Sequence, residues 1–272
     1  MISWPARASR LFALVTLVLS VASGGASAAP PQAHDKDSDD CDPRAAPNPN
    51  AGLREPAGDA GCPRGMALVA DAFCMDRYEA FLVVAGTEGR ESAWSPYQNP
   101  GERPVRARSA PGAVPQGYVN QRQAARACSA AGKRLCRDDE WLTACRGASQ
   151  RVYPYGDRRR PGVCNGARTR HPAIEIYGTN DPWIWSKLGN ACINQLDDAL
   201  APSGSYPGCA TDEGIYDLMG NLHEWTANPG GTFRGGYYAD TKGNGEGCLY
   251  RTRAHDIRYW DYSTGFRCCA DL

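Results

Sequence analysis

Apolar residues form two short runs early in the chain, at residues 66–69 and 73–78, with residues 70–72 between them. Runs of this length joined by so short a connection predict a β-hairpin with a tight turn. Cys62 and Cys74 flank the two runs, so a disulfide between them would staple the hairpin. The folded part of the chain is therefore expected to open at Cys62.

Helical periodicity is present in two segments that follow the hairpin. Asn120 is a suitable cap for a helix that carries small and apolar residues at 124, 125, 127 and 128, and Gly132 is suited to end it. A second helix is predicted from about Asp138 to Gly147. Beyond Gly147 the apolar pieces are short and interrupted by Gly and Pro, which total 30 and 20 in the chain. This part is expected to be loop-rich.

The N-terminus has the pattern of a signal peptide. Arg7 and Arg10 precede an apolar run at residues 11–20, and a small-x-small site ends at Ala28. We expect cleavage after Ala28, so that residues 1–28 are removed. The apolar run is shorter than the ~20 residues that span a bilayer, so no membrane span is expected after cleavage.

Residues 29–61 are rich in Pro, Ala, Asp and Asn and contain almost no large apolar side chains. Such a segment cannot bury enough surface to offset the entropy of ordering, so we predict a disordered tether carrying Cys41. Residues 62–272 then form the folded domain.

The charge balance and the cysteine content limit which cellular compartment and which classes of partner are expected. Basic and acidic residues number 30 each, which argues against a nucleic-acid partner. The 12 cysteines of an exported chain are expected to form disulfides, in the periplasm or outside the cell. Cys192 and Cys209 frame one loop and are a candidate pair, whereas connectivity of the others does not follow from sequence. No nucleotide-binding glycine loop or serine-hydrolase elbow is present.

Several motifs resemble those of the formylglycine-generating enzyme, or sulfatase-modifying factor, family in the same order. They lie at residues 132–135, 140–141, 145–147, 153–156, 214–225, 234–236 and 265–268. The resemblance covers roughly residue 66 to the C-terminus. It implies an α+β, C-type-lectin-like, loop-rich fold stapled by disulfides. It also implies that Cys145 pairs with Cys268.

The resemblance also implies calcium. The turn at residues 217–224 offers the Asp217 carboxylate, the carbonyls of Gly220 and Leu222 and the Glu224 carboxylate, which are the oxygen ligands that calcium prefers. The alternative is that Asp217 and Glu224 cap turns and pair with arginines.

A second calcium site of the family would correspond to a different loop of this sequence. The resemblance suggests Asn165 together with Asp197 or Asp198 for it.

The oxidases of the family bind copper(I) through two cysteine thiolates that follow an Arg-Gly-Gly motif. Counting from Arg234, the first of these positions is Asp240, and an active-site serine position is Tyr237. Cys248 could match the second cysteine. The alternative is that Cys248 forms a disulfide, with Cys269, Cys164 or another cysteine.

Three residues are candidates for the active-site groove that the resemblance implies. His223, Asp240 and His255 come from segments that would line this groove, although a lone histidine is more often structural. The same third of the chain is rich in aromatic residues, which suit either a recognition surface or a core: Tyr237, Tyr238, Tyr250, Tyr259, Trp260 and Tyr262.

These observations favour a calcium-stabilised binding or accessory module that lacks the complete copper-thiolate site and acts on an exported protein or peptide client. The alternative is an oxygen- and copper-dependent oxidase that converts a cysteine of a sulfatase-like client to formylglycine. A third hypothesis is a binder of carbohydrate or peptide.

Overall fold

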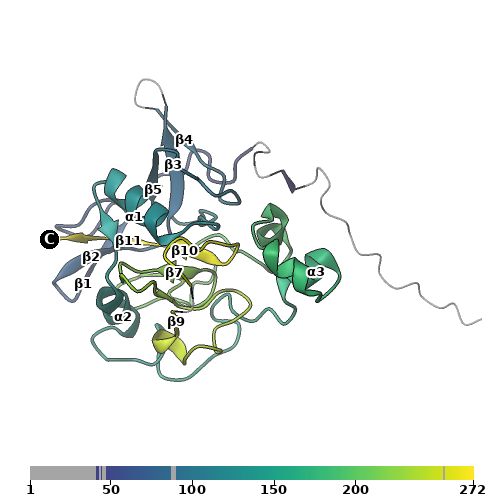
Figure 1. Cartoon of the computed structure of the whole chain (residues 1–272). Helices are drawn as coiled ribbons and strands as arrows, with labels where there is room; N and C mark the ends of the chain where they lie inside the picture. The colour runs from purple at the N-terminus through teal and green to yellow at the C-terminus, as the bar shows by residue number, and fades with distance from the viewer. Residues whose placement is uncertain (1–40, 43, 45–46, 87–89, 254) are drawn as a thin grey trace, which may run out of the picture. The chain divides into compact units, whose positions relative to one another are not determined.

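The computed structural model describes residues 41–42, 44, 47–86, 90–253 and 255–272 (Figure 1). The predicted signal peptide, residues 1–28, and residues 29–40 of the predicted tether lie outside this described part. The secondary structure consists of short strands and short helices joined by long irregular segments. The predicted α+β, loop-rich fold class is therefore confirmed.

The predicted hairpin is the start of a four-stranded sheet. β1 (Met66–Val69) pairs antiparallel with β2 (Phe73–Asp76), and two residues of the connecting turn have positive φ angles of 50° and 51°. β2 also pairs with the C-terminal strand β11 (Cys268–Asp271), and β11 pairs with β6 (Arg134–Leu135). The sheet order is β1-β2-β11-β6, so strands from the start and the end of the folded part lie together (Figure 1).

Two further sheets lie in the described part, and the hydrophobic pattern did not predict them. One has the order β10-β7-β8-β9, in which β10 and β7 are parallel and the other pairs antiparallel. Its strands are β7 (His223–Trp225), β8 (Phe233–Arg234), β9 (Arg251–Thr252) and β10 (Thr264–Phe266). The other sheet has the order β4-β3-β5, formed by β3 (Phe81–Ala85), β4 (Glu91–Ala93) and β5 (Val105–Arg108).

Both predicted helices are confirmed, as α1 (Gln121–Ala130) and α2 (Asp138–Arg146). The Asn120 side chain accepts a hydrogen bond from the Gln123 backbone N at 2.9 Å, and the Gln123 side chain accepts one from the Asn120 backbone N at 3.0 Å. This reciprocal capping box satisfies two backbone donors that the first turn of a helix leaves free.

The remaining helices of the described part are too short to produce a visible periodicity. They are α3 (Pro172–Tyr177) and the 3-10 helices η3 (Pro182–Ser186), η4 (Ala191–Gln195) and η5 (Gly247–Leu249). In Figure 1, α3 and its neighbouring helical turns, in green, stand beside the sheet that contains β7 and β10.

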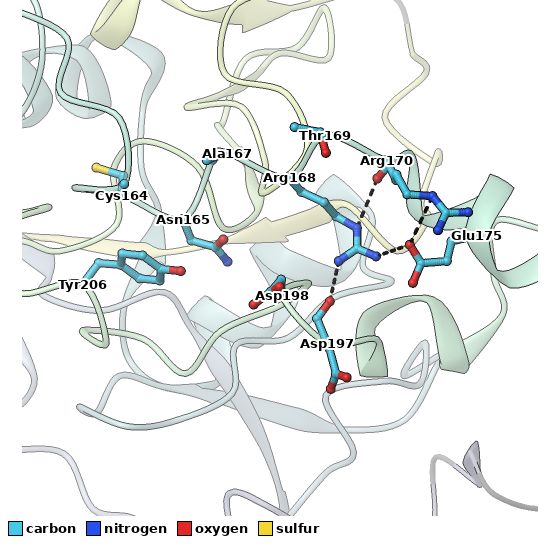
Figure 2. Close-up of a pocket in the computed structure, with 12 residues that line it drawn as sticks. Cys164, Asn165, Ala167, Arg168, Thr169, Arg170, Glu175, Asp197, Asp198 and Tyr206 are labelled. Atoms are coloured by element: carbon cyan, nitrogen blue, oxygen red, sulfur yellow. Dashed lines mark hydrogen bonds and ion pairs between the residues drawn. The ribbon is translucent and has the colours of Figure 1, made fainter.

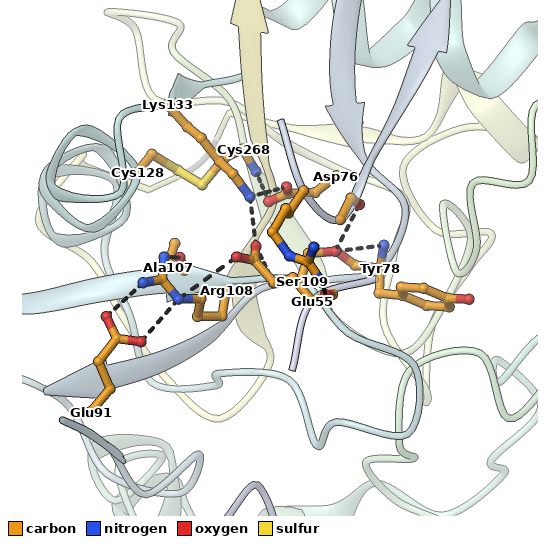
Figure 3. Close-up of polar contacts among 12 residues, drawn as sticks. Glu55, Asp76, Tyr78, Glu91, Ala107, Arg108, Ser109, Cys128, Lys133 and Cys268 are labelled. Atoms are coloured by element: carbon orange, nitrogen blue, oxygen red, sulfur yellow. Dashed lines mark hydrogen bonds and ion pairs between the residues drawn. A yellow bond between two sulfur atoms is a disulfide. The ribbon is translucent and has the colours of Figure 1, made fainter. Parts of the chain in front are cut away.

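Residues 47–61 differ from the disordered tether that their composition predicts. Asn50 is buried, and its side chain exchanges hydrogen bonds of 2.8 Å with the backbone of Val114. Glu55 reaches Lys133 at 2.8 Å, and Lys133 also pairs with the buried Asp76 at 2.7 Å (Figure 3). A few polar side chains with buried partners thus hold a segment that has little apolar surface of its own.

All twelve cysteines lie in the described part of the chain, and all are paired. The predicted staple of the hairpin, Cys62–Cys74, is confirmed. The other pairs are Cys41–Cys192, Cys128–Cys268, Cys136–Cys269, Cys145–Cys248 and Cys164–Cys209.

Two predicted pairings are wrong. Cys145 does not pair with Cys268. Cys268 and Cys269 are neighbours in β11 and point to opposite faces of the sheet, and Cys268 faces Cys128 of α1, to which it is bonded. Cys192 and Cys209 do not close the loop between them. Each is instead bonded to a cysteine that precedes this loop in the sequence, Cys41 and Cys164 respectively.

Candidate functional site

The three residues predicted for the groove, His223, Asp240 and His255, line one pocket of about 250 Å³, here called the groove pocket. His223 lies at the start of β7, Asp240 lies in the loop after β8, and His255 follows β9. Segments far apart in the sequence therefore meet at this pocket. Its other walls include His171 and Asp261.

The Asp240 carboxylate is fixed by neutral donors. One oxygen accepts hydrogen bonds from the backbone N of Lys242 at 2.8 Å and of Gly243 at 2.9 Å, and the other accepts one from the Tyr250 hydroxyl at 3.0 Å. Burial favours the neutral form, but these hydrogen bonds outweigh it and lower the pKa of Asp240 below its ordinary value. Asp240 therefore carries a negative charge at the pocket.

The His223 ring lies among aromatic rings, with centroids 4.7 Å from Phe233, 5.0 Å from Tyr237 and 5.6 Å from Tyr250. Burial lowers the pKa of this imidazole to about 3. Its buried Nδ1 has no hydrogen-bond partner within the described residues. His223 is therefore a neutral imidazole with one polar atom unsatisfied.

Replacing His223 by phenylalanine should stabilise the protein in acid. The unfolded histidine takes up a proton near pH 6.5 and the folded one near pH 3, so between these values the wild type loses about 1.4 kcal/mol of stability per pH unit as the pH falls. Urea unfolding from pH 7 to pH 4 should show a shallower acid slope for His223→Phe than for the wild type. Equal slopes would contradict the neutral, buried state of His223.

His255 also lines the groove pocket and is partly buried. Its ring stacks on Tyr259 at 3.9 Å and on Phe233 at 5.6 Å. The Tyr259 hydroxyl donates to the buried Asp261 carboxylate at 2.6 Å. The groove is thus lined by aromatic rings and acidic groups, which matches the aromatic cluster noted in the sequence.

Cys248 lies near this groove but is not a thiol. It is fully buried and bonded to Cys145 of α2. The alternative that Cys248 forms a disulfide is thus confirmed, although its partner is neither Cys269 nor Cys164. In this state Cys248 cannot supply the thiolate that copper(I) requires.

The turn at residues 217–224 places the first predicted calcium ligands in a buried charge cluster. The Glu224 carboxylate accepts two hydrogen bonds from the Arg267 guanidinium, at 2.5 and 2.6 Å, and one from the Trp141 indole at 2.7 Å. Asp217 accepts a hydrogen bond from the Gly204 backbone N at 2.7 Å.

These residues do not fit a calcium ion in this arrangement. Both oxygens of Glu224 are engaged, and calcium would have to displace the Arg267 guanidinium from them. Gly220 has a φ angle of 81°, and a Cβ there would collide with the Asn165 carbonyl, so this turn is packed tightly on residue 165. The geometry fits the alternative interpretation, in which Glu224 pairs with an arginine and Asp217 caps a turn.

Glu79 is a member of this cluster that the sequence analysis missed. It accepts hydrogen bonds from the Leu222 backbone N at 3.1 Å and from the Asn221 side chain at 2.5 Å. Burial raises its pKa well above the ordinary value and raises the pKa of Asp217 to about 6. The sequence did contain one indication that Glu79 is functional or structural. It is a carboxylate that lies three residues after β2, between two apolar stretches.

The second predicted calcium set lines a different pocket, of about 460 Å³, here called the Asn165 pocket (Figure 2). Asn165 donates to the Ala199 carbonyl at 2.8 Å and to the Asn221 side-chain oxygen at 2.9 Å. Figure 2 shows the Asp198 carboxylate toward Asn165, while the Asp197 carboxylate points away. The Asp197 carbonyl accepts a hydrogen bond from Arg168, which also pairs with Glu175 at 2.8 Å.

Neither a membrane-spanning helix nor a ready-made cluster of metal ligands is present among the described residues. No helix among them has the length and apolarity of a membrane-spanning segment. No three of their His, Cys, Asp or Glu side chains are grouped as ligands of one metal ion. A calcium site formed by the described residues would therefore need carbonyl, amide or water ligands in addition to carboxylates.

A family model and two curated relatives point to one family. A family model described as "Sulfatase-modifying factor enzyme 1-like domain" matches residues 67–272. The chain is 32% identical to the inactive C-alpha-formylglycine-generating enzyme 2 of Mus musculus over 136 residues, which is 47% of this chain and 39% of that protein. It is 30% identical to the formylglycine-generating enzyme of Mus musculus over 112 residues, which is 41% of this chain and 26% of that protein.

The chain thus spans well under half the length of these curated relatives. Among solved structures, PvdO from Pseudomonas aeruginosa is 18% identical, with a TM-score of 0.43, 74% of this chain covered and 80% of that one. The P3c variant of the major tropism determinant is 15% identical, with a TM-score of 0.44, 80% of this chain covered and 55% of that one.

Proposed function

The chain belongs to the sulfatase-modifying factor enzyme 1-like domain family, and on this premise we propose that it is a binding or accessory module and not a copper-dependent cysteine oxidase. One of the relatives above bears the word "inactive" in its name, and another is named a formylglycine-generating enzyme without that word. Membership therefore leaves both roles open, and the choice depends on the residues of this chain.

The observation that carries the proposal is the bonded state of Cys248. An oxidase of the kind predicted as the alternative needs two thiolates, since soft sulfur ligands select copper(I). Cys248 is bonded to Cys145, and the position expected for the other cysteine holds Asp240. A carboxylate fixed by Tyr250 and backbone donors is a hard ligand that cannot replace a thiolate.

Copper(I) titration together with oxygen uptake tests this proposal. The non-reduced protein, mixed with a peptide that contains one cysteine, is expected to bind no copper(I) through thiolates and to consume no oxygen above a protein-free control. Tight copper(I) binding accompanied by oxygen uptake and conversion of the peptide cysteine to an aldehyde would support the oxidase instead.

We also propose that the protein is periplasmic or secreted. Six disulfides are typical of proteins that fold in an oxidising compartment. The N-terminal pattern of Arg7, Arg10 and an apolar run supports export, with an exported protein or peptide as the client.

Calcium is proposed for the Asn165 pocket in preference to the turn at residues 217–224. Asp197 and Asp198 are both exposed, and the Asp198 side chain lies toward Asn165 (Figure 2).

Calcium should raise the melting temperature of the protein relative to its value in a chelator, and Asp198→Asn should remove this difference. The matched control is Asp212→Asn, an exposed carboxylate paired with Arg151, which should retain it. A calcium effect that survives Asp198→Asn would place the ion elsewhere.

A further inference from the structure

A third pocket, of about 930 Å³, lies where the N-terminal segment meets the sheet β4-β3-β5 and is here called the strap pocket. Its walls come from the segments at residues 50–55 and 63–64, from each strand of that sheet, and from residues 131 and 133 after α1. It shares no lining residue with the groove pocket or the Asn165 pocket. Its volume is in the range of pockets that hold small organic ligands, so it is a separate candidate site.

Positive charge predominates in the wall of the strap pocket. Among the described residues the wall contains four basic side chains and two acidic ones: Arg54, Arg64, Arg108 and Lys133, and Glu55 and Glu91. Two charges just outside the wall cancel each other, since Asp76 pairs with Lys133 and Arg106 lies 3.6 Å from Glu91. Four basic groups against two acidic groups leave an excess of two positive charges.

The two carboxylates of the wall already have cationic partners. Glu55 accepts hydrogen bonds from Lys133 at 2.8 Å and from the Ser109 backbone N at 3.1 Å, and its other oxygen is 3.7 Å from the Arg108 Nε (Figure 3). Glu91 accepts two hydrogen bonds from Arg108, at 2.5 and 3.1 Å. These contacts neutralise both carboxylates, so the excess positive charge belongs to the two remaining arginines.

Arg54 and Arg64 are exposed and form no ion pair with a carboxylate of the described residues. Arg64 donates one hydrogen bond, to the backbone carbonyl of Glu55 at 2.5 Å. A guanidinium has five N–H donors in a fork that matches the oxygens of phosphate. Most donors of Arg64, and all those of Arg54, therefore remain open to a ligand within the described part of the chain.

Lys133 supplies an independent observation in the same wall. Its side chain is 3% exposed, and two of its three ammonium donors bind Glu55 and Asp76. Burial lowers the pKa of Lys133, but Asp76 and Glu55 outweigh burial and raise it, so the ammonium is charged. The third N–H has no acceptor among the described residues. An unmet donor of a buried cation is costly, so this wall favours an acceptor from outside the chain.

We propose that the strap pocket binds a small phosphate monoester, with Arg54 and Arg64 holding the phosphate group. A phosphate monoester carries close to two negative charges at neutral pH, which matches the excess of the wall, and arginine binds phosphate oxygens bidentately. A cation would be repelled, and a neutral sugar would leave both charges without a counter-charge. The pocket is larger than a phosphate ion needs, so the esterified part also has room. This inference goes beyond the proposed function, because it concerns a pocket outside the groove.

Isothermal titration of the full chain tests the ligand class. The probe is glycerol 3-phosphate at about pH 8, where its phosphate is dianionic, with a chelator present to exclude calcium. We expect saturable binding that salt weakens, no binding of glycerol, and at least about tenfold weaker binding of ethyl sulfate, which carries one charge. No binding of glycerol 3-phosphate, or equal affinity for ethyl sulfate, would overturn the proposal. Inorganic phosphate should bind more weakly than the ester, and equal affinity would overturn the assignment to an ester.

Two variants test the arginines against general surface charge. Arg54→Gln and Arg64→Gln should each weaken binding of glycerol 3-phosphate at least about tenfold. Neither removes an ion pair of the described residues, so both should melt like the wild type without ligand. The matched control is Arg122→Gln, an exposed arginine of α1 outside this pocket, which should bind normally. Normal binding by both pocket variants, or equal weakening by Arg122→Gln, would refute the assignment.

Hydrogen exchange tests where the ligand binds. Saturating glycerol 3-phosphate should slow the exchange of backbone amides at residues 50–55 and 63–65, because the ligand would hold the segment that carries both arginines against the sheet. Slowing confined to other segments would overturn the assignment to the strap pocket. A negative outcome here leaves the absence of copper-thiolate oxidation standing, since that is measured separately by oxygen uptake.

Discussion

Replacing Arg267 by methionine is expected to lower the free energy of unfolding by about 3–5 kcal/mol at neutral pH, because removing one member of a buried ion pair leaves the other charge uncompensated. Arg267 is fully buried and donates to both oxygens of Glu224 and to the backbone carbonyls of Asp76 and Tyr216. Urea unfolding followed by tryptophan fluorescence measures the loss.

The loss should depend on pH, because Arg267 is close to two further buried carboxyl groups. Its charge holds down the pKa values of Glu79 and Asp217, which burial nevertheless raises, to about 6 for Asp217. Without the guanidinium these groups bind protons still more readily when folded. The deficit of the variant should therefore be greatest above pH 6 and shrink as the pH falls and the folded carboxyl groups become neutral.

An exposed ion pair provides the control for this experiment. Arg126→Met removes the partner of Glu102 at the surface and should change stability by no more than about 0.5 kcal/mol. If Arg267→Met were as stable as the wild type in calcium but not in a chelator, a cation would have replaced the guanidinium beside Glu224. That result would restore the first predicted calcium site.

The parts of the fold that the sequence predicted are those with strong local signals. The hairpin and α1 were predictable because a turn between apolar runs and a capping box act within a few residues. β8 and β9 contain two residues each, and α3 contains six, so no periodicity exists to detect. These elements are positioned by disulfides and buried polar contacts between distant residues.

The candidate site was also predictable only in part. Motif order brought His223, Asp240 and His255 to one groove, as the pocket shows. The partner of Glu224 could not be identified, because Arg267 is 43 residues away and the choice between calcium and an arginine depends on three-dimensional proximity. The predicted pairing of Cys145 with Cys268 was wrong for the same reason, since the order of the motifs does not show that Cys268 faces Cys128 of α1.

Removing the disulfide between Cys145 and Cys248 with a double alanine substitution should lower the free energy of unfolding by about 5 kcal/mol in the chain-entropy model. The two cysteines are separated by 103 residues, and the bond ties α2 to η5 beside the groove. Removing Cys62–Cys74, which spans 12 residues, is the matched control and should cost about 3 kcal/mol.

The single variant Cys145→Ala extends this experiment to function, because it releases Cys248 as a thiol without supplying a second one. If copper-driven oxidation requires two thiolates, this variant should lose stability yet gain no oxygen uptake with a cysteine peptide. Asp240→Cys in the same background would restore a pair of sulfur atoms at the positions that the family resemblance implies. Oxygen uptake by Cys145→Ala alone would show that one sulfur is sufficient, and the case for a non-oxidase role would fail.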